Sequence, residues 1–520
     1  MSTHEPGTSS GELSVRRLSR RKVLGLGLGL VAAVPLTAAC GAQQPATPAA
    51  PAAKTESKPA ETKPAAAAKT EAKPAEAAKP AQQAAGVPKA KINGRLVVVQ
   101  SRDFHPDHNT FIENQIKEFA ERQGYPLDHS YIEAYAGAGN VVQKLTAAVQ
   151  ANDAPDLLVH TLRPSELKFL EIIQPIGNVE QEIQQQHGKM LPAPTKRTNL
   201  DGEIWAVPHF TRAAGNWVRT TPFQEAGIDG RSLNDLPAIR EAALKASKPG
   251  QELWGWGRTA NRSGDGESMV REVVMMSGGQ LTEETGQLVV LNQDPYRENA
   301  IRGLEWLKET YTDPQFAPML PPGVNAWTDT ANNEAYLAGK IFYTSNAGTM
   351  YAKAVVDKNP VAEDTWMIGV PKGIGPNARS LQGAADTMNF FIMQGAKNRE
   401  AAEQMIKHLF EPEIMRQMFR ISTGYVYPAH EWGWDEPMIA QDPLALHVTP
   451  AWKQVAFDPA GYTAGEWPGP PTPWAASLES SNFWTDMFGE ILGGKAVPDA
   501  VRDAHGRAVR VFKEFGAKGE

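Results

Sequence analysis

The sequence is nearly free of cysteine, since Cys40 is the only one among 520 residues. A single thiol cannot form a disulfide within the chain, so the fold does not depend on a disulfide framework. No cysteine follows Cys40, so a cysteine nucleophile is also excluded from the rest of the chain.

Common catalytic motifs are missing as well. Beyond residue 40 the chain has no Gly-x-Ser-x-Gly nucleophile elbow and no His-Glu-x-x-His metal helix. A phosphate-binding loop is not expected at residues 338–341, because the upstream glycine and the hydroxyl residue after Lys340 are absent. The best metal-like cluster, residues 105–108, contains two histidines without further ligands, and no carboxylate pair stands out by its spacing. We therefore expect no metal, no cofactor and no enzymatic activity.

The sequence has no large excess of either sign of charge and no long apolar run beyond residue 40. The formal net charge is −7, without a basic stripe or an arginine-rich helix, so nucleic acid is not an expected partner. Beyond residue 40 no apolar stretch approaches the roughly 20 residues that span a bilayer.

The N-terminal forty residues have the pattern of an export signal. Arg20 and Arg21 precede a short apolar run, Val23 to Val34, and small residues precede Cys40. The paired arginines resemble a twin-arginine signal, and the residues before Cys40 resemble the lipobox of bacterial lipoproteins. A membrane anchor is the alternative, but the run is short and interrupted by glycines. We expect residues 1–39 to be the signal and Cys40 to carry lipid, on the outer face of the cytoplasmic membrane.

A low-complexity tract follows the lipidation site. From Gly41 to about Pro88 the chain consists almost entirely of Ala, Pro, Lys, Glu, Thr and Gln. Such a tract buries too little apolar surface to offset its ordering entropy, and its prolines favour an extended conformation. Residues 40–93 are therefore predicted to be a disordered tether.

Residues 94–520 are long enough for two or three domain-sized cores. The β-branched run at Leu96–Val99 is followed by a helical face, a second strand, a second helix and a third strand at Asp156–Val159. This alternation predicts a parallel sheet with crossover helices, so the expected class is α/β. Later apolar faces predict further helices near residues 295–307, 402–410 and 501–512.

Tryptophan is plentiful, with 13 residues, many of them near Gly, Pro, Asn or Asp. Examples are Trp254, Trp256, Trp327 and the loop-rich stretch from Glu431 to Trp474. Packing in a core is the usual role of a single tryptophan. As a set, flat rings beside polar groups favour a cleft for ligands such as sugars.

Several segments resemble the extracellular solute-binding proteins of ABC importers, particularly the family 1 group that includes sugar binders. Ala154–Leu158 is similar to the family's Pro-Asp-apolar strand, and Trp205–Pro208 to its crossover. Gly278-Gly279, residues 335–340, the helix from Asn398 and residues 491–495 follow in the family's order. The resemblance extends from about Gly94 to Phe515.

The resemblance implies two α/β lobes that close on a solute and deliver it to the transmembrane permease subunits. It implies a first lobe at about 94–207 and 320–394, and a second at about 208–319 and 395–520. The protein is expected to be a monomer that does no covalent chemistry. Two alternatives remain, a surface-anchored glycan hydrolase with an aromatic-lined cleft, and a sensor that kept the binding fold.

Ligands of open α/β sheets bind beyond the carboxyl ends of the strands. Together with the resemblance, this rule gives the following candidate ligand residues: Asp103, Phe104, His105, His160, Thr161, Arg163, Phe210, Arg212, Trp256, Arg258, Asn346, Asp386, Tyr427, Trp467 and Trp474. Where the family often has tyrosine after the crossover, this chain has Trp217-Val218-Arg219. A specific sugar is therefore not predicted.

Overall fold

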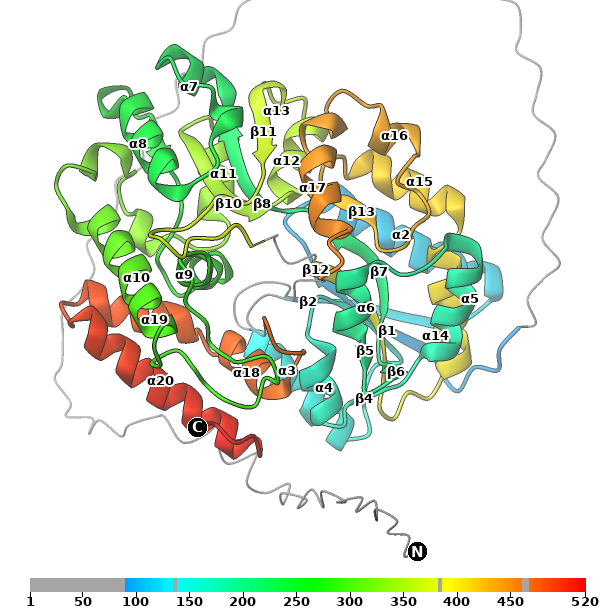
Figure 1. The fold of residues 1–520 in the computed structure, drawn as a ribbon. Helices are drawn as coiled ribbons and strands as arrows, with labels where there is room; N and C mark the ends of the chain where they lie inside the picture. Colours follow the sequence, from blue (N-terminus) through cyan, green and yellow to red (C-terminus); the bar gives the residue numbers. More distant parts are fainter. Residues whose placement is uncertain (1–88, 134–137, 382–385, 461–466) are drawn as a thin grey trace, which may run out of the picture. The chain divides into compact units, whose positions relative to one another are not determined.

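The computed structural model describes residues 89–133, 138–381, 386–460 and 467–520. The predicted signal with Arg20 and Arg21, the lipidation site Cys40 and most of the predicted tether lie outside these residues. The described residues belong to one compact unit, Ala84–Glu520, which is built on two β-sheets flanked by helices (Figure 1).

The first sheet has the strand order β13-β7-β12-β3-β1-β2, and β4 pairs with β12. Its central part is the predicted parallel unit, because β1 pairs in parallel with both β2 and β3. β12 is antiparallel to its neighbours β3 and β7. The strands are β1 (Leu96–Arg102), β2 (Leu127–Glu133), β3 (Leu157–His160), β4 (Ile173–Gln174), β7 (Val207–Arg212), β12 (Asp386–Met393) and β13 (Val426–Pro428).

The second sheet has the strand order β11-β8-β10-β9. β8 is antiparallel to β10 and β11, whereas β9 is parallel to β10. The strands are β8 (Ala214–Arg219), β9 (Trp254–Trp256), β10 (Ile341–Ala347) and β11 (Thr365–Ile368), and a separate small hairpin consists of β5 (Asn199–Leu200) and β6 (Glu203–Ile204).

Helices surround both sheets, and we call each sheet with its helices a lobe (Figure 1). The first lobe contains α2 (Pro106–Gln123), α3 (Ala138–Gln150), α4 (Pro164–Phe169), α5 (Gly177–His187), α6 (Pro192–Thr198), α14 (Arg399–Leu409), α15 (Pro412–Ile421), α16 (Pro437–Ala440), η5 (Ala445–His447) and α17 (Thr449–Ala456). The second contains α7 (Thr220–Glu225), η1 (Gly230–Ser232), α8 (Leu236–Ala246), η2 (Pro249–Gln251), α9 (Gly264–Met276), α10 (Tyr296–Thr312), η3 (Ala317–Met319), η4 (Val324–Ala326), α11 (Ala331–Leu337), α12 (Thr349–Val356), α13 (Val361–Asp364), α18 (Pro473–Ser480), α19 (Phe483–Leu492) and α20 (Val497–Glu514).

The predicted helical faces are buried. On α10, Ala300, Leu304 and Leu307 are fully enclosed, although the helix begins at Tyr296, with Pro295 rather than Asp294 as its N-cap. The faces predicted for α14 and α20 are also buried. Regular 3.6-residue apolar spacing is thus a sufficient signal for these helices, because each buries its stripe against a core.

The Asp156 carboxylate ties β1, β3 and α14 together. Its Oδ1 accepts hydrogen bonds from the backbone N–H groups of Lys397 and Asn398 at 2.7 and 2.8 Å. Its Oδ2 accepts from the Val97 N–H at 2.9 Å and from the Asn398 side chain at 3.0 Å. The side chain is nearly fully buried, so these four donors replace the water that the charge loses on folding.

The chain passes from the first lobe to the second at Ala213, between β7 and β8. It returns between β11 and β12, and passes over again between α17 and α18. The expected crossover at Trp205–Pro208 is therefore corrected, because Val207 and Pro208 already belong to β7 and pair with β12.

The expected lobe ranges are corrected in the same way. β10 and β11 lie within 320–394, expected for the first lobe, but both pair with β8 in the second sheet. α14 and α15 lie within 395–520, expected for the second lobe, but both pack on α2 in the first. Of the described residues, 89–133, 138–212 and 386–456 build the first lobe, and 214–368 and 473–520 build the second. The predicted tether is corrected at its end, because the buried Ala90 donates its N–H to the Tyr125 hydroxyl at 2.8 Å and so belongs to the first lobe.

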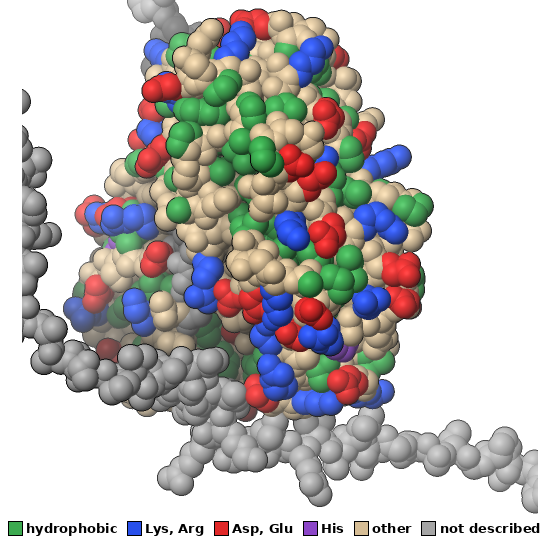
Figure 2. Space-filling view, turned by 90° about the vertical axis from the view of Figure 1, so that its left-hand side faces the viewer, with side chains coloured by type: hydrophobic (Ala, Val, Ile, Leu, Met, Phe, Trp, Pro, Cys, Tyr) green, Lys and Arg blue, Asp and Glu red, His purple; other side chains and the backbone are tan. Residues whose placement is uncertain are grey.

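The surface in Figure 2 carries Lys and Arg side chains interspersed with Asp and Glu side chains, so neither sign of charge forms a continuous stripe on this face. Among the helices of the described residues, none is both long and apolar enough to cross a membrane.

Candidate functional site

A cleft of about 370 Å³ lies between the two lobes. The first lobe contributes the ends of β3 and β7, the beginning of β12, and α4 and α6. The second lobe contributes β8, β10, α9 and α18. The carboxyl ends of β3, β7 and β10 thus meet at one cavity, as the rule for ligands of open α/β sheets predicts, and the antiparallel strands β8 and β12 begin there.

Charged and amide side chains make up half of the described lining residues of the cleft. The charged members are Arg163, Glu166, Arg197, Arg212, Asp265, Glu267, Arg271, Glu272, Asp329, Asp386 and Glu479. Asparagine amides join them at positions 216, 333, 346 and 482. Among the described lining residues none is phenylalanine, tyrosine or tryptophan, and the His160 imidazole is the ring they contribute.

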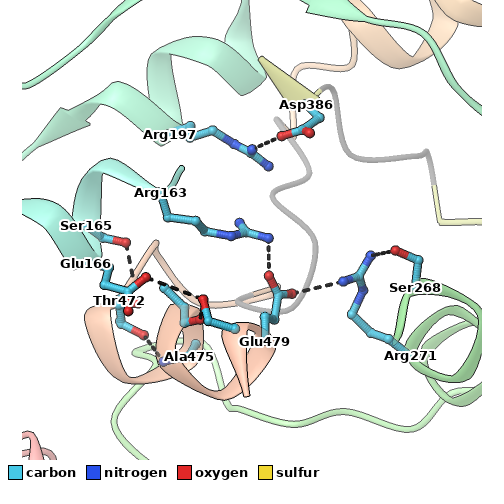
Figure 3. A network of polar contacts seen from close by, with 12 residues as sticks. Arg163, Ser165, Glu166, Arg197, Ser268, Arg271, Asp386, Thr472, Ala475 and Glu479 are labelled. Atoms are coloured by element: carbon cyan, nitrogen blue, oxygen red, sulfur yellow. Dashed lines mark hydrogen bonds and ion pairs between the residues drawn. The ribbon is translucent and has the colours of Figure 1, made fainter. Parts of the chain in front are cut away.

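Two arginines hold the Asp386 carboxylate at the wall of the first lobe. Arg197 on α6 pairs with Oδ1, and Arg212 at the end of β7 pairs with Oδ2; Figure 3 shows the first contact. Burial alone would raise the pKa of Asp386, but the Arg212 and Arg197 guanidinium groups lower it far below its usual range. The carboxylate therefore stays ionised and fixes both cations at the cleft.

A second ion-pair network connects the two lobes. The Glu479 carboxylate on α18 pairs with Arg163, just before α4, through Oε2. Its Oε1 lies 3.1 Å from Nη1 of Arg271 on α9. Figure 3 shows Glu479 between the two arginines.

Three acidic side chains of the lining have raised pKa values. Burial raises the pKa of Glu166 and of Glu267 to about 7. Burial, and then the neighbouring Asp329 carboxylate, raises the pKa of Asp265 to about 8. Each carboxyl therefore keeps its proton in the folded protein at pH values where the unfolded chain has already lost it.

These shifts predict that the free energy of unfolding falls by about 1–2 kcal/mol between pH 7 and pH 9. An acid whose folded pKa is raised contributes stability below its unfolded pKa and loses it as the pH rises through its folded pKa. Burial lowers the pKa values of four histidines, His108, His160, His187 and His209. Their protonation therefore changes the free energy of unfolding at lower pH and not between pH 7 and pH 9.

Urea unfolding at the two pH values measures the effect. Glu166→Gln should reduce the fall, because the amide has no proton to lose, whereas the exposed Glu118→Gln on α2 should leave it unchanged. A stability that rises from pH 7 to pH 9 would contradict the assignment.

Six of the sequence-predicted ligand residues lie along the cleft: His160, Thr161, Arg163, Arg212, Asn346 and Asp386. His160 is held in one orientation, since its Nδ1 accepts from the Leu162 N–H at 3.1 Å and its Nε2 lies 2.9 Å from the Glu133 carbonyl. Contact between these residues and a solute stays a prediction.

The candidates that follow β1 lie outside the cleft lining. Asp103 accepts a hydrogen bond from the Tyr425 hydroxyl, and its carboxylate also accepts from the Phe104 N–H at 2.7 Å. The buried His105 contacts the Ile421 carbonyl at 2.6 Å through Nε2. These side chains connect β1 to α15 and β13 instead of facing the cavity.

The aromatic candidates are occupied in the protein interior or on loops. Phe210 and Trp256 are fully buried in the cores of the first and second lobe. The Tyr427 ring stacks on Trp434 with 5.4 Å between centroids. The expectation of an aromatic-lined cleft is therefore corrected for the described residues, because burying these rings in the cores stabilises the fold more than exposing them.

The remaining candidates have similar roles in the second lobe. Arg379 lies over the Trp467 ring, 4.3 Å from its centroid, and the Trp474 indole donates to the Gly286 carbonyl at 2.7 Å. Arg258 is buried behind the cleft, where its Nη2 lies 2.8 Å from the Glu272 carboxylate, which lines the cavity.

Sequence reasoning missed the lining residues that helices supply. Asp265 and Arg271 lie on α9, and Glu479 lies on α18. The strand-end rule searches loops after strands, so helical positions escape it. The only sequence signal is a charge on an otherwise apolar helical face, and that signal is common on exposed helices.

Comparison with known proteins agrees with this architecture. The family model described as bacterial extracellular solute-binding protein matches residues 108–416. No curated protein matches the chain significantly.

Several solved structures share the fold at low sequence identity. The maltose-bound MalE3 of T. maritima is 16% identical, with a TM-score of 0.64 over 81% of this chain and 98% of that chain. An ABC transporter solute-binding protein of Agrobacterium radiobacter, in complex with ribitol, is 15% identical, with a TM-score of 0.64 over 81% and 98%. A sugar transporter of Arthrobacter chlorophenolicus with bound laminaribiose is 16% identical, with a TM-score of 0.63 over 80% and 99%.

The family model covers more than half of the chain, and the structural matches have the same two-lobed α/β fold. This chain belongs to the bacterial extracellular solute-binding protein family.

Proposed function

We propose that the protein is the solute-binding subunit of an ABC importer. It captures a small polyhydroxylated solute, a carbohydrate or a polyol, between its lobes and delivers it to permease subunits in the membrane. The observation that supports the proposal is the cavity between the lobes, which the ends of β3, β7 and β10 and the beginnings of β8 and β12 reach. A solute held there touches both lobes, so binding favours the closed arrangement.

The lining suits a solute with many hydroxyl groups. Carboxylates such as Asp386 accept hydrogen bonds, guanidinium groups such as Arg212 donate them, and the asparagine amides do both. Since the described lining has no phenylalanine, tyrosine or tryptophan ring, recognition depends on hydrogen bonds more than on stacking. Maltose, laminaribiose and ribitol in the structural relatives support a carbohydrate or polyol here.

Export and anchoring complete the proposal. Twin-arginine export would place the folded protein outside the cytoplasmic membrane, and lipid on Cys40 would hold it there. A tether over residues 40–88 would let a monomer reach its permease without a transmembrane helix of its own.

A panel of maltose, laminaribiose, ribitol and mannitol tests the proposal by thermal shift and calorimetry. We expect at least one of them to raise Tm, because a ligand that binds only the folded state stabilises it. Thr161→Val should reduce this shift by removing one hydroxyl from the cleft. Thr312→Val on the exposed end of α10 is the matched control.

The same panel separates binding from catalysis. A bound solute recovered unchanged after several hours agrees with a transport subunit. Product formation would favour the glycan hydrolase instead, and the absence of any shift with sugars and polyols would contradict the proposed solute class.

A further inference from the structure

Helices α4 and α18 form a contact between the lobes beside the cleft. α4 belongs to the first lobe, since Leu167 packs in the cluster that contains Ile172 and Phe391. α18 belongs to the second lobe, since Leu478 packs with Phe483 and Trp484. Any opening of the cleft that moves one lobe as a body must change this contact.

The contact combines polar and apolar pairs. The Ser165 hydroxyl lies 3.5 Å from the Thr472 carbonyl, and the Ser480 hydroxyl lies 3.5 Å from the Glu166 carboxyl group. At the other end of α4, the Phe169 ring lies 4.9 Å, between centroids, from the ring of Phe515, the C-cap of α20 in the second lobe. These neutral contacts are long or partly exposed, so each contributes little.

Glu479 makes the strongest interaction in this contact. It is 11% exposed, and its two oxygens reach Arg163 of the first lobe and Arg271 of the second (Figure 3). Arg163 and Arg271 are 18% and 11% exposed. Ion pairs with so little water around them are screened less than surface pairs and have a larger energetic effect.

We propose that Glu479 is a latch residue that sets how far the lobes are closed before any solute arrives. The carboxylate is anchored in the second lobe by Arg271 and holds the first lobe through Arg163. The apparent affinity for a solute falls as the closed fraction falls, so the latch also sets solute affinity. This last consequence depends on the proposed function, whereas the closure itself does not.

Pulsed electron paramagnetic resonance on the solute-free protein tests the latch. Spin labels at the exposed Gln186 of α5 and Arg510 of α20 report the distance between the lobes. The full chain carries Cys40→Ser, so that only the two introduced cysteines are labelled. We expect one short distance population in this background.

Glu479→Gln keeps the shape of the side chain but removes its charge. We expect it to shift the distance distribution to longer values and to lower the ratio of closed to open protein about tenfold. Arg163→Met should have a similar effect. The double variant should be no more open than Glu479→Gln alone, because both changes remove the same interaction.

Lys340→Met is the matched control, because it removes an exposed ion pair with Glu252 inside the second lobe. It should leave the distances unchanged. Unchanged distances in Glu479→Gln, or an additive effect of the double change, would overturn the latch. A latch confirmed in solute-free protein while the sugar panel fails would contradict only the proposed solute class.

Discussion

Asp386→Ala is expected to lower the free energy of unfolding by about 3–5 kcal/mol and to abolish solute binding. The substitution leaves Arg197 and Arg212, which are 4% and 16% exposed, without their shared carboxylate. Cations held away from water without a counterion are strongly unfavourable, so the first-lobe wall of the cleft should rearrange or unfold.

Urea unfolding measures the loss, and three variants define its origin. Asp386→Asn keeps the shape of the side chain and should lose less stability. Combining Asp386→Ala with Arg212→Met should recover part of the lost stability, because it removes one of the two cations that Asp386 neutralises. Asp357→Ala, which breaks the exposed pair with Lys353, should change stability by less than about 0.5 kcal/mol. A loss below about 1 kcal/mol in Asp386→Ala would mean that the cluster does not stabilise the fold.

Asp156→Ala is expected to lower the free energy of unfolding by about 3 kcal/mol, the second-largest effect. Its carboxylate accepts four hydrogen bonds that join β1, β3 and the start of α14. Without it the Val97, Lys397 and Asn398 N–H groups lose their acceptor in a buried place, and each unpaired donor is costly. Solute affinity should change little, because Asp156 does not line the cleft.

Asp156→Asn separates charge from shape. Its amide oxygen can still accept hydrogen bonds on one side, but its NH₂ group faces a donor on the other. We therefore expect the free energy of unfolding to fall by about 2 kcal/mol. Asp153→Ala, three residues earlier and exposed, is the matched control with a change below about 0.5 kcal/mol. Equal stabilities of Asp156→Ala and the control would refute this role.

The parallel unit of the first lobe could be predicted from the sequence because local patterns determine it. The β-branched run of β1 and the apolar stripe of α2 each bury a face that is visible in the residue order. The lobe boundaries could not be predicted in this way. β10 and β11 pair with β8 across more than 100 residues of chain, and no local pattern encodes that pairing.

The cleft was predictable only in part, for a related reason. The strand-end rule led to His160, because the edge of a sheet is implied by its strands, whereas Arg212 and Asp386 were predicted from the family resemblance. Glu479 and Arg271 come from helices whose packing brings them to the cavity. The tryptophans pointed to a stacking site, but residues such as Trp217, Trp256 and Trp452 are fully buried. Their composition signal cannot distinguish a binding surface from a core.

A crystal structure of the protein with the solute that gives the largest Tm shift would show where that solute binds. We expect it to be enclosed between the lobes, with hydrogen bonds to at least one side chain of each lobe, among them residues of the Asp386 or Glu479 networks. A solute bound on the outer surface of one lobe, with the cleft unoccupied, would contradict this expectation.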